Sequence, residues 1–204
     1  MKKITFLILL LTGITNAQTD TRIYDIINNV STEKIKKDIT KLANSGTRHT
    51  LSDTISDTRG IGAARRWIKS EFDKISKKCT DCLDVFYQKD LVKKNKKRIV
   101  HDVMIVNVVA VQRGTKYPNR YIIMSGDIDS RVSDPNDYTS DSPGANDNAS
   151  GMAGTIEAAR VLSNYTFENS IIYVGLSGEA QGLFGGRVLA AYAEEKGWEM
   201  MSIR

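Results

Sequence analysis

The second half of the chain alternates between short apolar segments and longer segments with helical periodicity. This alternation limits the possible folds more than any other feature. Short runs rich in Val and Ile are typical of buried strands, and amphipathic patterns with a repeat of about 3.6 residues are typical of helices. The expected strands are residues 82–91, 99–112, 119–127 and 169–177, with a further strand beginning at 198, and the expected helices are 148–163 and 182–197. This order favours an α/β fold in which helices sandwich a mixed β-sheet.

Two more helices are expected before the first strand. Residues 31–44 place apolar side chains at helical spacing, with Ser31 or Thr32 as the cap. Residues 59–76 do the same over a longer stretch that runs from Ile61 to Ile75. Gly197 is placed to end the last helix, because glycine favours the left-handed conformation found after a helix C-terminus.

The first 17 residues have the pattern of a secretory signal peptide. A basic start is followed by an apolar run and then by small residues that end at Ala17, the expected cleavage site. The alternative is an uncleaved anchor, but the apolar run is short for a membrane span. We therefore expect a protein that is secreted or periplasmic after cleavage, without a stable membrane span, and in which residues 18–204 form a single domain.

The chain contains two cysteines, Cys79 and Cys82. In an exported protein such a pair favours a local disulfide. A redox site of the thioredoxin type would follow a strand and open a helix, whereas this pair follows a helix and precedes a strand. A zinc site built on cysteine would need a second pair. We expect a disulfide that staples the turn.

The formal net charge is +5, and the isoelectric point is about 9.1. Much of the excess lies in residues 93–98, between two expected strands, and near the end of the helix at 59–76. A solvated turn is the simplest interpretation of residues 93–98. The basic run has no interleaved aromatic residues, so we expect no nucleic-acid partner.

Acidic residues follow the expected strands, where α/β proteins place their sites. Asp127 and Asp129 stand at alternate positions of an extended segment, so their side chains point the same way. Two adjacent carboxylates repel each other unless a cation lies nearby, and that cation could be a divalent metal or Arg131. The alternative is a pair of solvated acids beside a turn.

Two further acids are expected at the same rim. Asp147 lies in the segment SPGANDNASGMAG, whose small residues let another chain segment or an ion approach closely. Its alternative role is to cap the following helix. Glu179 ends an apolar strand, where partial burial would raise its pKa and suit it to general-base catalysis. Its alternative is an ordinary acid at a helix entry.

Three separated segments carry a resemblance to a known family. SGDIDSR, SPGANDNASGMAGTIEAARVLS and IIYVGLSGEAQGLFGG occur in that order, preceded by GTRHT and GIGAARRWI. They resemble the co-catalytic zinc aminopeptidases of the bacterial leucyl aminopeptidase type, peptidase family M28, over about residues 45–204. The resemblance implies a zinc-exopeptidase-like fold, two zinc ions and a peptide or protein substrate that is hydrolysed by metal-activated water.

The resemblance also implies roles for individual residues. Asp147 matches the aspartate that bridges the two zinc ions, and Glu179 matches the general base. Asp127 matches a zinc-ligand position, and Asp129 matches the aspartate that orients a metal-bound histidine.

The sequence departs from the family pattern at several positions. Asp127 stands where the family usually has a histidine, and Ala180 stands where it has a second glutamate that binds zinc. The family's last two ligands, an aspartate and a histidine, would follow Arg204. His49 and His101 precede all the motifs and are expected to be structural. We therefore expect an incomplete zinc-ligand set in a C-terminally truncated domain, with impaired activity.

Two alternatives remain open. A non-catalytic binding module on the same fold would explain Ala180 and the incomplete ligand set. A glutaminyl-cyclase-like enzyme would use a single zinc ion, which also suits a depleted site.

Overall fold

The computed structural model describes residues 20–95 and 97–201, so the expected signal peptide at residues 1–17 lies outside the described residues. Within this part, five strands form one sheet in the order β1-β2-β4-β3-β5. The strands are β1 (Leu83–Val92), β2 (Val103–Gln112), β3 (Tyr117–Asp127), β4 (Asn169–Leu176) and β5 (Glu199–Met200). Each expected strand is present.

The sheet is mixed, as predicted. β1 pairs with β2, and β2 with β4, in antiparallel orientation. β3 runs parallel to β4 on one side and to the short β5 on the other. In the β3–β4 register, Asp127 lies beside Leu176, so these two strands end next to each other at one edge of the sheet.

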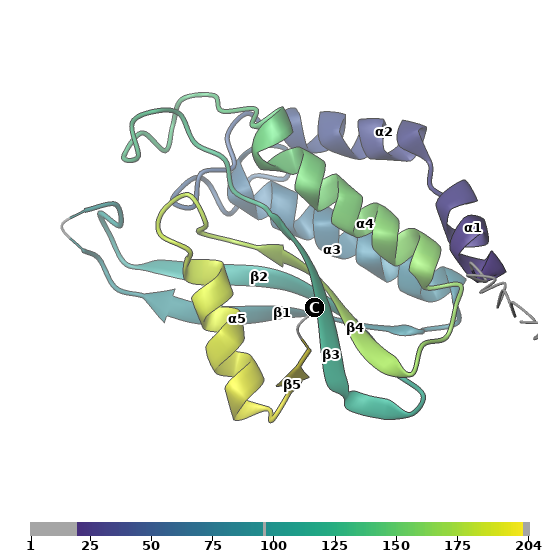
Figure 1. Ribbon diagram of the computed structural model, residues 1–204. Coiled ribbons are helices and arrows are strands. Elements are labelled where there is room, and N and C mark those ends of the chain that lie inside the picture. Colours follow the sequence, from purple (N-terminus) through teal and green to yellow (C-terminus); the bar gives the residue numbers. More distant parts are fainter. Residues whose placement is uncertain (1–19, 96, 202–204) are drawn as a thin grey trace, which may run out of the picture.

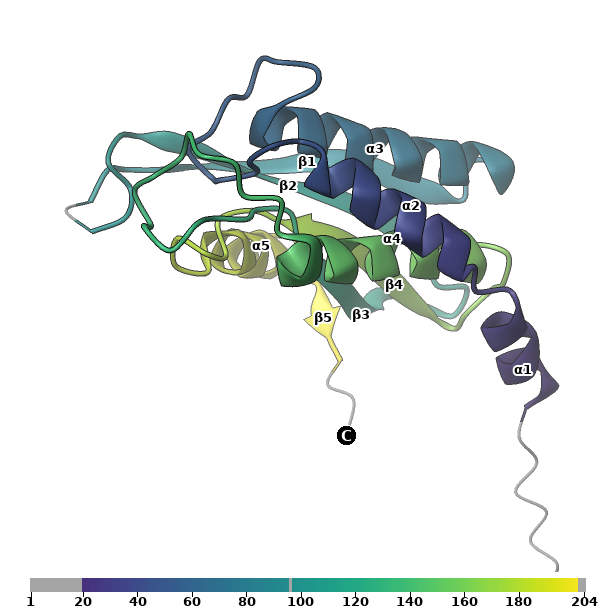
Figure 2. The same ribbon diagram turned by 90° about the horizontal axis from the view of Figure 1, so that it is seen from above.

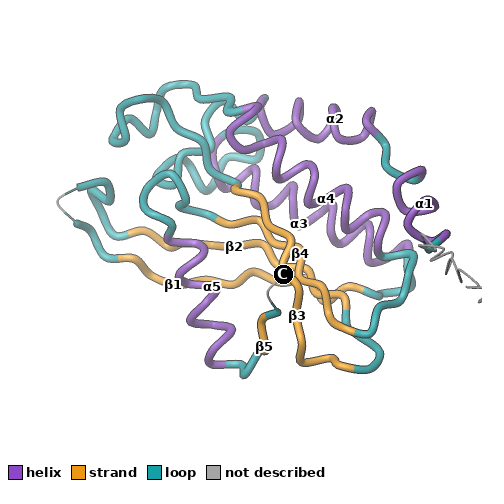
Figure 3. The backbone as a smooth tube through the Cα atoms, viewed as in Figure 1, coloured by secondary structure: helices purple, strands orange, loops and turns teal. Residues whose placement is uncertain are grey.

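Helices cover both faces of the sheet (Figures 1 and 2). The helices α2 (Thr32–Ala43), α3 (Gly60–Lys78) and α4 (Ser150–Leu162) lie on one face, and α5 (Phe184–Glu195) lies on the other. Figure 3 shows the same layers by secondary structure, with the longer connecting loops at one end of the sheet. None of the described helices combines the length and apolarity that a membrane crossing requires.

One helix was not expected from the sequence. α1 (Thr21–Asn28) begins at Asp20, whose side chain accepts a hydrogen bond from the backbone N–H of Arg22 at 3.0 Å. It buries none of its residues and lies at one end of the helical layer (Figure 1). Its apolar pattern is short, so it indicates a helix less clearly than the longer helical patterns that follow.

The strands β2 and β4 are mostly apolar because both of their faces are covered, although they also bury Asn107 and Ser170. In β2, Val108 and Ala110 pack into the cluster under α3 and α4. Val109 and Val111 pack into the cluster on the α5 side, together with Leu189 of that helix. Successive side chains of a strand point to opposite faces, so one continuous apolar run supplies two cores.

The helix ends follow the expected chemistry. Ser31 caps α2 by accepting a hydrogen bond from Lys34 N at 3.3 Å. After α5, Gly197 adopts a φ of +65°, Trp198 N donates to Ala193 O at 2.9 Å, and Gly197 N donates to Glu194 O at 3.1 Å. This pattern is a Schellman motif, which supports the predicted C-terminal role of Gly197.

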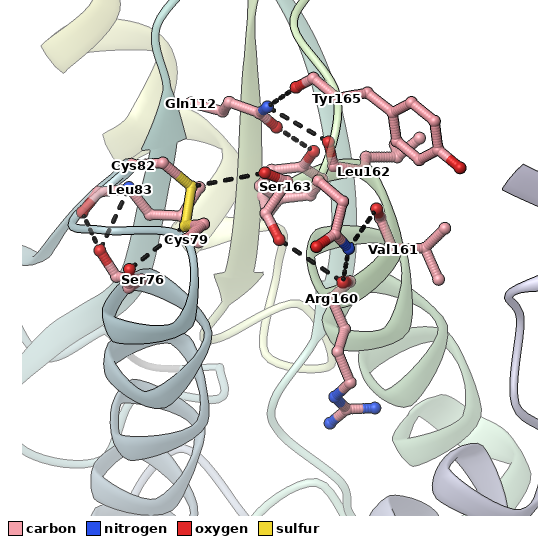
Figure 4. The surroundings of a disulfide bond; sticks show 12 residues. Ser76, Cys79, Cys82, Leu83, Gln112, Arg160, Val161, Leu162, Ser163 and Tyr165 are labelled. Carbon is pink, nitrogen blue, oxygen red and sulfur yellow. Dashed lines mark hydrogen bonds between the residues drawn. A yellow bond between two sulfur atoms is a disulfide. The ribbon is translucent and has the colours of Figure 1, made fainter. Parts of the chain in front are cut away.

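The expected disulfide joins Cys79 and Cys82 in the turn between α3 and β1 (Figure 4). Next to it, the hydroxyl of Ser76 donates to Leu83 O at 2.8 Å and accepts from Leu83 N at 3.1 Å. The covalent bond and this serine together fix the end of α3 against the first strand.

Candidate metal and catalytic site

The adjoining ends of β3 and β4 form the frame of the candidate site. Ile128 N donates to Leu176 O at 2.7 Å, which keeps the segment after β3 beside the end of β4 beyond the regular sheet. The segment after β3 continues to Asp129, and the segment after β4 continues through Ser177 to Glu179. The predicted convergence of these two segments on one rim is therefore confirmed.

Asp147 reaches the same rim from the long loop before α4. It lies in η1 (Ala145–Ala149), a short turn in which the backbone of Asp147 itself is not helical, and its side chain is exposed. No side chain caps the N-terminus of α4, so the alternative role of Asp147 as a helix cap is wrong. The expected helix start at residue 148 is two residues early, because α4 begins at Ser150.

A buried arginine holds the loop that carries Asp147. The guanidinium of Arg48 donates to Pro143 O at 2.7 Å and to Gly144 O at 3.0 Å, just before η1. Its Nε donates to Ile128 O at 2.8 Å, beside Asp129. Arg48 therefore ties the Asp147 loop to the end of β3, a role that no local sequence pattern indicated.

Asp129, Asp147 and Glu179 line one cleft of about 480 Å³. Its walls are formed by Asp129, Ser130, Arg131, Val132, Ser133, Asp147, Glu179 and Ala180. We call this the acidic cleft. Asp127 is not among the wall residues, but it lies close enough for the charges of Asp129, Glu179 and Asp147 to act on it. A larger cleft of about 790 Å³ lies elsewhere, and none of these acids lines it.

Crowding of negative charge perturbs the acids. Burial, followed by the charges of Asp129, Glu179 and Asp147, raises the pKa of Asp127 to about 6. Burial, and then the same kind of repulsion, raises the pKa of Glu179, although Arg131 and Arg98 act in the opposite direction. The expected direction for Glu179 is confirmed, and its cause is that expected of a partly desolvated acid.

Asp129 is buried, and its carboxylate is occupied by the loop that follows β4. It accepts hydrogen bonds from the backbone N–H groups of Gly178 at 2.8 Å, Glu179 at 3.1 Å and Ala180 at 3.0 Å. The hydroxyl of Thr50 donates to it as well, at 3.3 Å. Burial raises the pKa of Asp129, while the backbone hydrogen bonds lower it. In this structure Asp129 orients the backbone that carries Glu179.

Small residues around the site allow close packing between chain segments. A Cβ atom on Gly126 would lie 2.5 Å from the N and Cα atoms of Met152, so glycine lets the start of α4 approach β3. A Cβ atom on Gly144 would lie 2.5 Å from the Cβ atom of Ser130, which belongs to the segment after β3. The expected close approach of another chain segment is therefore present.

The donor set fits part of a metal site. Asp127 and Asp147 offer carboxylate oxygens that zinc accepts, and their repulsion is what a bound cation would relieve. Position 180 offers only a methyl group. Across residues 20–95 and 97–201, no cluster of three or more His, Cys, Asp or Glu side chains is placed to hold a metal ion.

The two histidines have structural surroundings. His49 is buried, its Nδ1 accepts from Leu51 N at 3.0 Å, and its Nε2 lies 3.1 Å from Pro135 O. Burial lowers the pKa of His49. His101 is exposed and contacts Asp102 O through Nδ1 at 3.0 Å. The surroundings of His49 fit the expected structural role, whereas the structural role of the exposed His101 stays a prediction.

The basic turn after β1 reaches the candidate site. Its described side chains are exposed, as expected of a solvated turn, and Lys93 pairs with Asp102 at 2.8 Å. Arg98 donates to Ala180 O at 2.9 Å, next to Glu179. Sequence reasoning missed this contact because residues 98 and 180 are far apart along the chain.

Comparison with known proteins agrees with this geometry. Residues 107–203 match the model of peptidase family M28. A probable zinc metalloprotease of Pyrenophora teres f. teres is 45% identical over 171 residues, which cover 84% of this chain and 35% of that protein. The chain thus spans about a third of the length of this relative.

Solved structures share the fold at low sequence identity. The LapA aminopeptidase of Legionella pneumophila superposes with a TM-score of 0.69 at 17% identity, over 97% of this chain and 47% of that one. A glutaminyl cyclase of Fimbriiglobus ruber gives 0.64 at 19% identity, over 85% of this chain and 60% of that one. Together with the family match and the relative above, the acid-bearing ends of β3 and β4 lead to one assignment: the chain belongs to peptidase family M28.

Proposed function

We propose that this chain serves zinc-dependent hydrolysis of peptide bonds, in the manner of an aminopeptidase. The observation that carries the proposal is the convergence of Asp127, Asp147 and Glu179 at the adjoining ends of β3 and β4. The names of the relatives, a zinc metalloprotease and an aminopeptidase, support the same reaction class.

The proposed roles follow from the chemistry of the side chains. Zinc, when bound, would lower the pKa of a coordinated water and polarise the substrate carbonyl. Asp127 and Asp147 would hold the metal through carboxylate oxygens. Glu179, whose pKa is raised, would take a proton from the attacking water and deliver it to the leaving amine. Asp129 would keep Glu179 in place through the backbone of its loop.

We further propose that a polypeptide of residues 1–204 is impaired as an enzyme. Ala180 occupies the position at which the family supplies a second glutamate, and a methyl group binds no metal. Two carboxylates and water hold zinc weakly in competition with solvent. We expect no tight two-zinc site in this polypeptide and little or no peptidase activity.

Export is part of the proposal. The signal-peptide pattern of residues 1–17 supports a secreted or periplasmic location. The disulfide between Cys79 and Cys82 suits the oxidising environment of such a compartment.

The test compares the 204-residue chain with two variants. Zinc binding would be measured by calorimetry, and release of the amino-terminal residue from a short peptide would be followed by chromatography. Ala180→Glu should bind zinc more tightly and raise the activity, because it restores a carboxylate. Adding Glu179→Gln to that variant should lower the activity about 10²- to 10⁴-fold, the usual contribution of a general base, and leave zinc binding in place.

A surface substitution, Lys196→Gln, is the matched control and should change neither quantity. Tight binding of two zinc ions by the unaltered chain would contradict the proposed impairment. Activity that persists after chelation, or after Glu179→Gln, would contradict the proposed reaction.

Two other functions are supported by specific observations. The fold shared with a glutaminyl cyclase favours cyclisation of an amino-terminal glutamine, and mass spectrometry of a Gln-initiated peptide separates this reaction from hydrolysis. Ala180 favours a binding module without catalysis. In that case Ala180→Glu would bind zinc and still leave peptides intact.

A further inference from the structure

A second cleft lies between the loop that joins α2 to α3 and the start of β2. Its volume is about 790 Å³, and its walls include Thr50, Asp53, Arg65, Asp102 and Met104. Its walls contain none of the acids Asp127, Asp147 and Glu179. We call it the arginine cleft, because a buried arginine forms part of its wall.

That arginine, Arg65, has an unsatisfied guanidinium. Its side chain extends from α3, and the residue is only 5% exposed. Its Nε donates to the hydroxyl of Ser177 at 3.3 Å, but its Nη2 is buried without a hydrogen-bond partner among the described residues. Burial lowers the pKa of Arg65 to about 10, with Asp129 opposing, so the group still carries its charge at neutral pH.

The neighbouring acids are already engaged. Asp129, whose charge acts on Arg65, accepts three backbone N–H groups and the hydroxyl of Thr50. Asp102, in the wall of the arginine cleft, pairs with Lys93 at 2.8 Å. A buried cation whose N–H group lacks an acceptor is unfavourable, and it is relieved when an anion binds.

The other arginine of the same wall differs in this respect. Arg59 pairs with Asp141 at 2.6 Å and donates to Thr139 O at 2.9 Å, and it is exposed. Arg65 forms no ion pair among the described residues. Of these two arginines, Arg65 is therefore the one that can still pair with an anion.

We propose that the arginine cleft binds a small molecule through a carboxylate that faces Arg65. A carboxylate accepts hydrogen bonds in the plane of a guanidinium and carries a single charge. Asp53 and Asp102 also line the cleft and would repel a doubly charged phosphate more strongly. The volume admits a ligand much larger than the carboxylate itself.

The probe for this site is sodium acetate, added to the 204-residue chain in the presence of a chelator. Binding would be followed through the ¹⁵N resonance of the Arg65 Nε–H group. We expect a saturable shift of that resonance, and no such shift with glycinamide, which carries no carboxylate. The measurement involves neither zinc nor catalysis, so its outcome is independent of the proposed peptidase function.

Three variants localise the binding. Arg65→Gln should weaken acetate binding at least tenfold, measured by calorimetry. Met104→Trp places a bulky side chain in the wall without altering Arg65, and it should weaken binding several-fold in a chain that still unfolds cooperatively. Arg113→Gln, a change to an exposed arginine outside the cleft, should keep the affinity within twofold of the unaltered chain.

Several results would overturn the proposal. One is unchanged acetate affinity in a folded Met104→Trp or Arg65→Gln chain. Another is the absence of any acetate-dependent shift up to high millimolar concentration. Saturable binding of inorganic phosphate without binding of acetate would show that the cleft selects a different anion.

Discussion

Two groups of acids in this molecule have opposite surroundings. Between α2, α3 and α4, Arg160 pairs with Asp38 at 2.9 Å and with Glu71 at 3.6 Å, and it also contacts Glu157. We call this the Arg160 cluster. In the acidic cleft, Asp147 and Glu179 have no ion pair among the described residues, and neither has Asp127 beside it. Both groups are packed by the fold, but only in the Arg160 cluster are the acids paired with a cation, although Arg131 also lines the acidic cleft.

The difference separates a structural role from a functional one. The Arg160 cluster is a closed network, since Glu157 also accepts a hydrogen bond from Ser31 N at 2.7 Å and so ties the start of α2 to α4. The carboxylates in and beside the acidic cleft form no ion pair among the described residues, and burial together with their mutual repulsion raises the pKa of Asp127 to about 6. Unpaired acids held together in a cleft are typical of a site for a cation or for proton transfer.

The largest effect is expected from breaking the Arg160 cluster. Arg160→Met would leave Asp38 and Glu157 buried without a cation, and it should lower the free energy of unfolding by about 3–5 kcal/mol. Urea denaturation measures this change. Lys196→Met, which breaks an exposed pair with Glu195, is the control and should leave the free energy of unfolding nearly unchanged. If both variants lost the same free energy of unfolding, the Arg160 cluster would stabilise the fold no more than an exposed ion pair does.

A smaller effect is expected at the buried end of the acidic cleft. Asp129→Ala would leave the N–H groups of Gly178, Glu179 and Ala180 without their acceptor, which should cost about 2–3 kcal/mol. Amide hydrogen exchange at these three residues should accelerate more than exchange in β4. If their exchange rates stayed unchanged, Asp129 would not be what orients the Glu179 loop.

The acidic cleft should make stability depend on pH. The folded pKa of Asp127 is about 6, above its ordinary value of 3.8, so the folded chain binds more protons between these values. Its contribution is therefore favourable at low pH and is lost as the pH rises from about 4 to about 6. Asp127→Asn should remove this slope and, allowing for solvent screening of a half-buried group, stabilise the chain at pH 7 by about 1–2 kcal/mol.

The measurement is thermal unfolding across this pH range in the presence of a chelator. Asp84→Asn, on the exposed surface of β1, is the matched control. If the stability of Asp127→Asn still fell as the pH rose from about 4 to about 6, another acid would be the cause of the pH dependence.

The smallest effect is expected at Arg131. This exposed side chain donates to Val132 O and Ser133 O and does not pair with the acids, so Arg131→Ala should change stability by less than about 0.5 kcal/mol. It should nevertheless raise the pKa of Glu179, because Arg131 lowers it in the intact cleft. A ¹³C titration of the Glu179 carboxyl measures the shift. A lower pKa in the variant would mean that Arg131 does not act on Glu179 through its charge.

Local patterns predicted most of the fold. The apolar runs of β2 and β4 and the helical spacing of α3 are strong signals, because each element buries a long, regular face. α1 has no buried residue to enforce its pattern, and it was missed. The start of α4 was misplaced by two residues because the backbone at Asp147 and Asn148 is not helical, which the following helical pattern concealed.

The candidate acids were also found from the sequence, since Asp127, Asp129 and Glu179 follow apolar strands. Their partners were not. Arg48 holds the Asp147 loop, Arg98 contacts Ala180, and Arg65 forms the wall of the arginine cleft. Each of these contacts joins residues that are far apart along the chain, where no periodicity or spacing links them.

The sequence by itself therefore determined the order of the elements, the mixed α/β class and the acids at the strand ends, because these depend on local periodicity and residue type. Only the tertiary structure decided which acids are paired and which are not. Arg160 neutralises one group because α4 packs against α2 and α3. Asp127, Asp147 and Glu179 form no ion pair among the described residues. The ends of β3 and β4 and the Arg48-held loop bring these carboxylates together, while the nearby Arg131 donates to backbone oxygens instead.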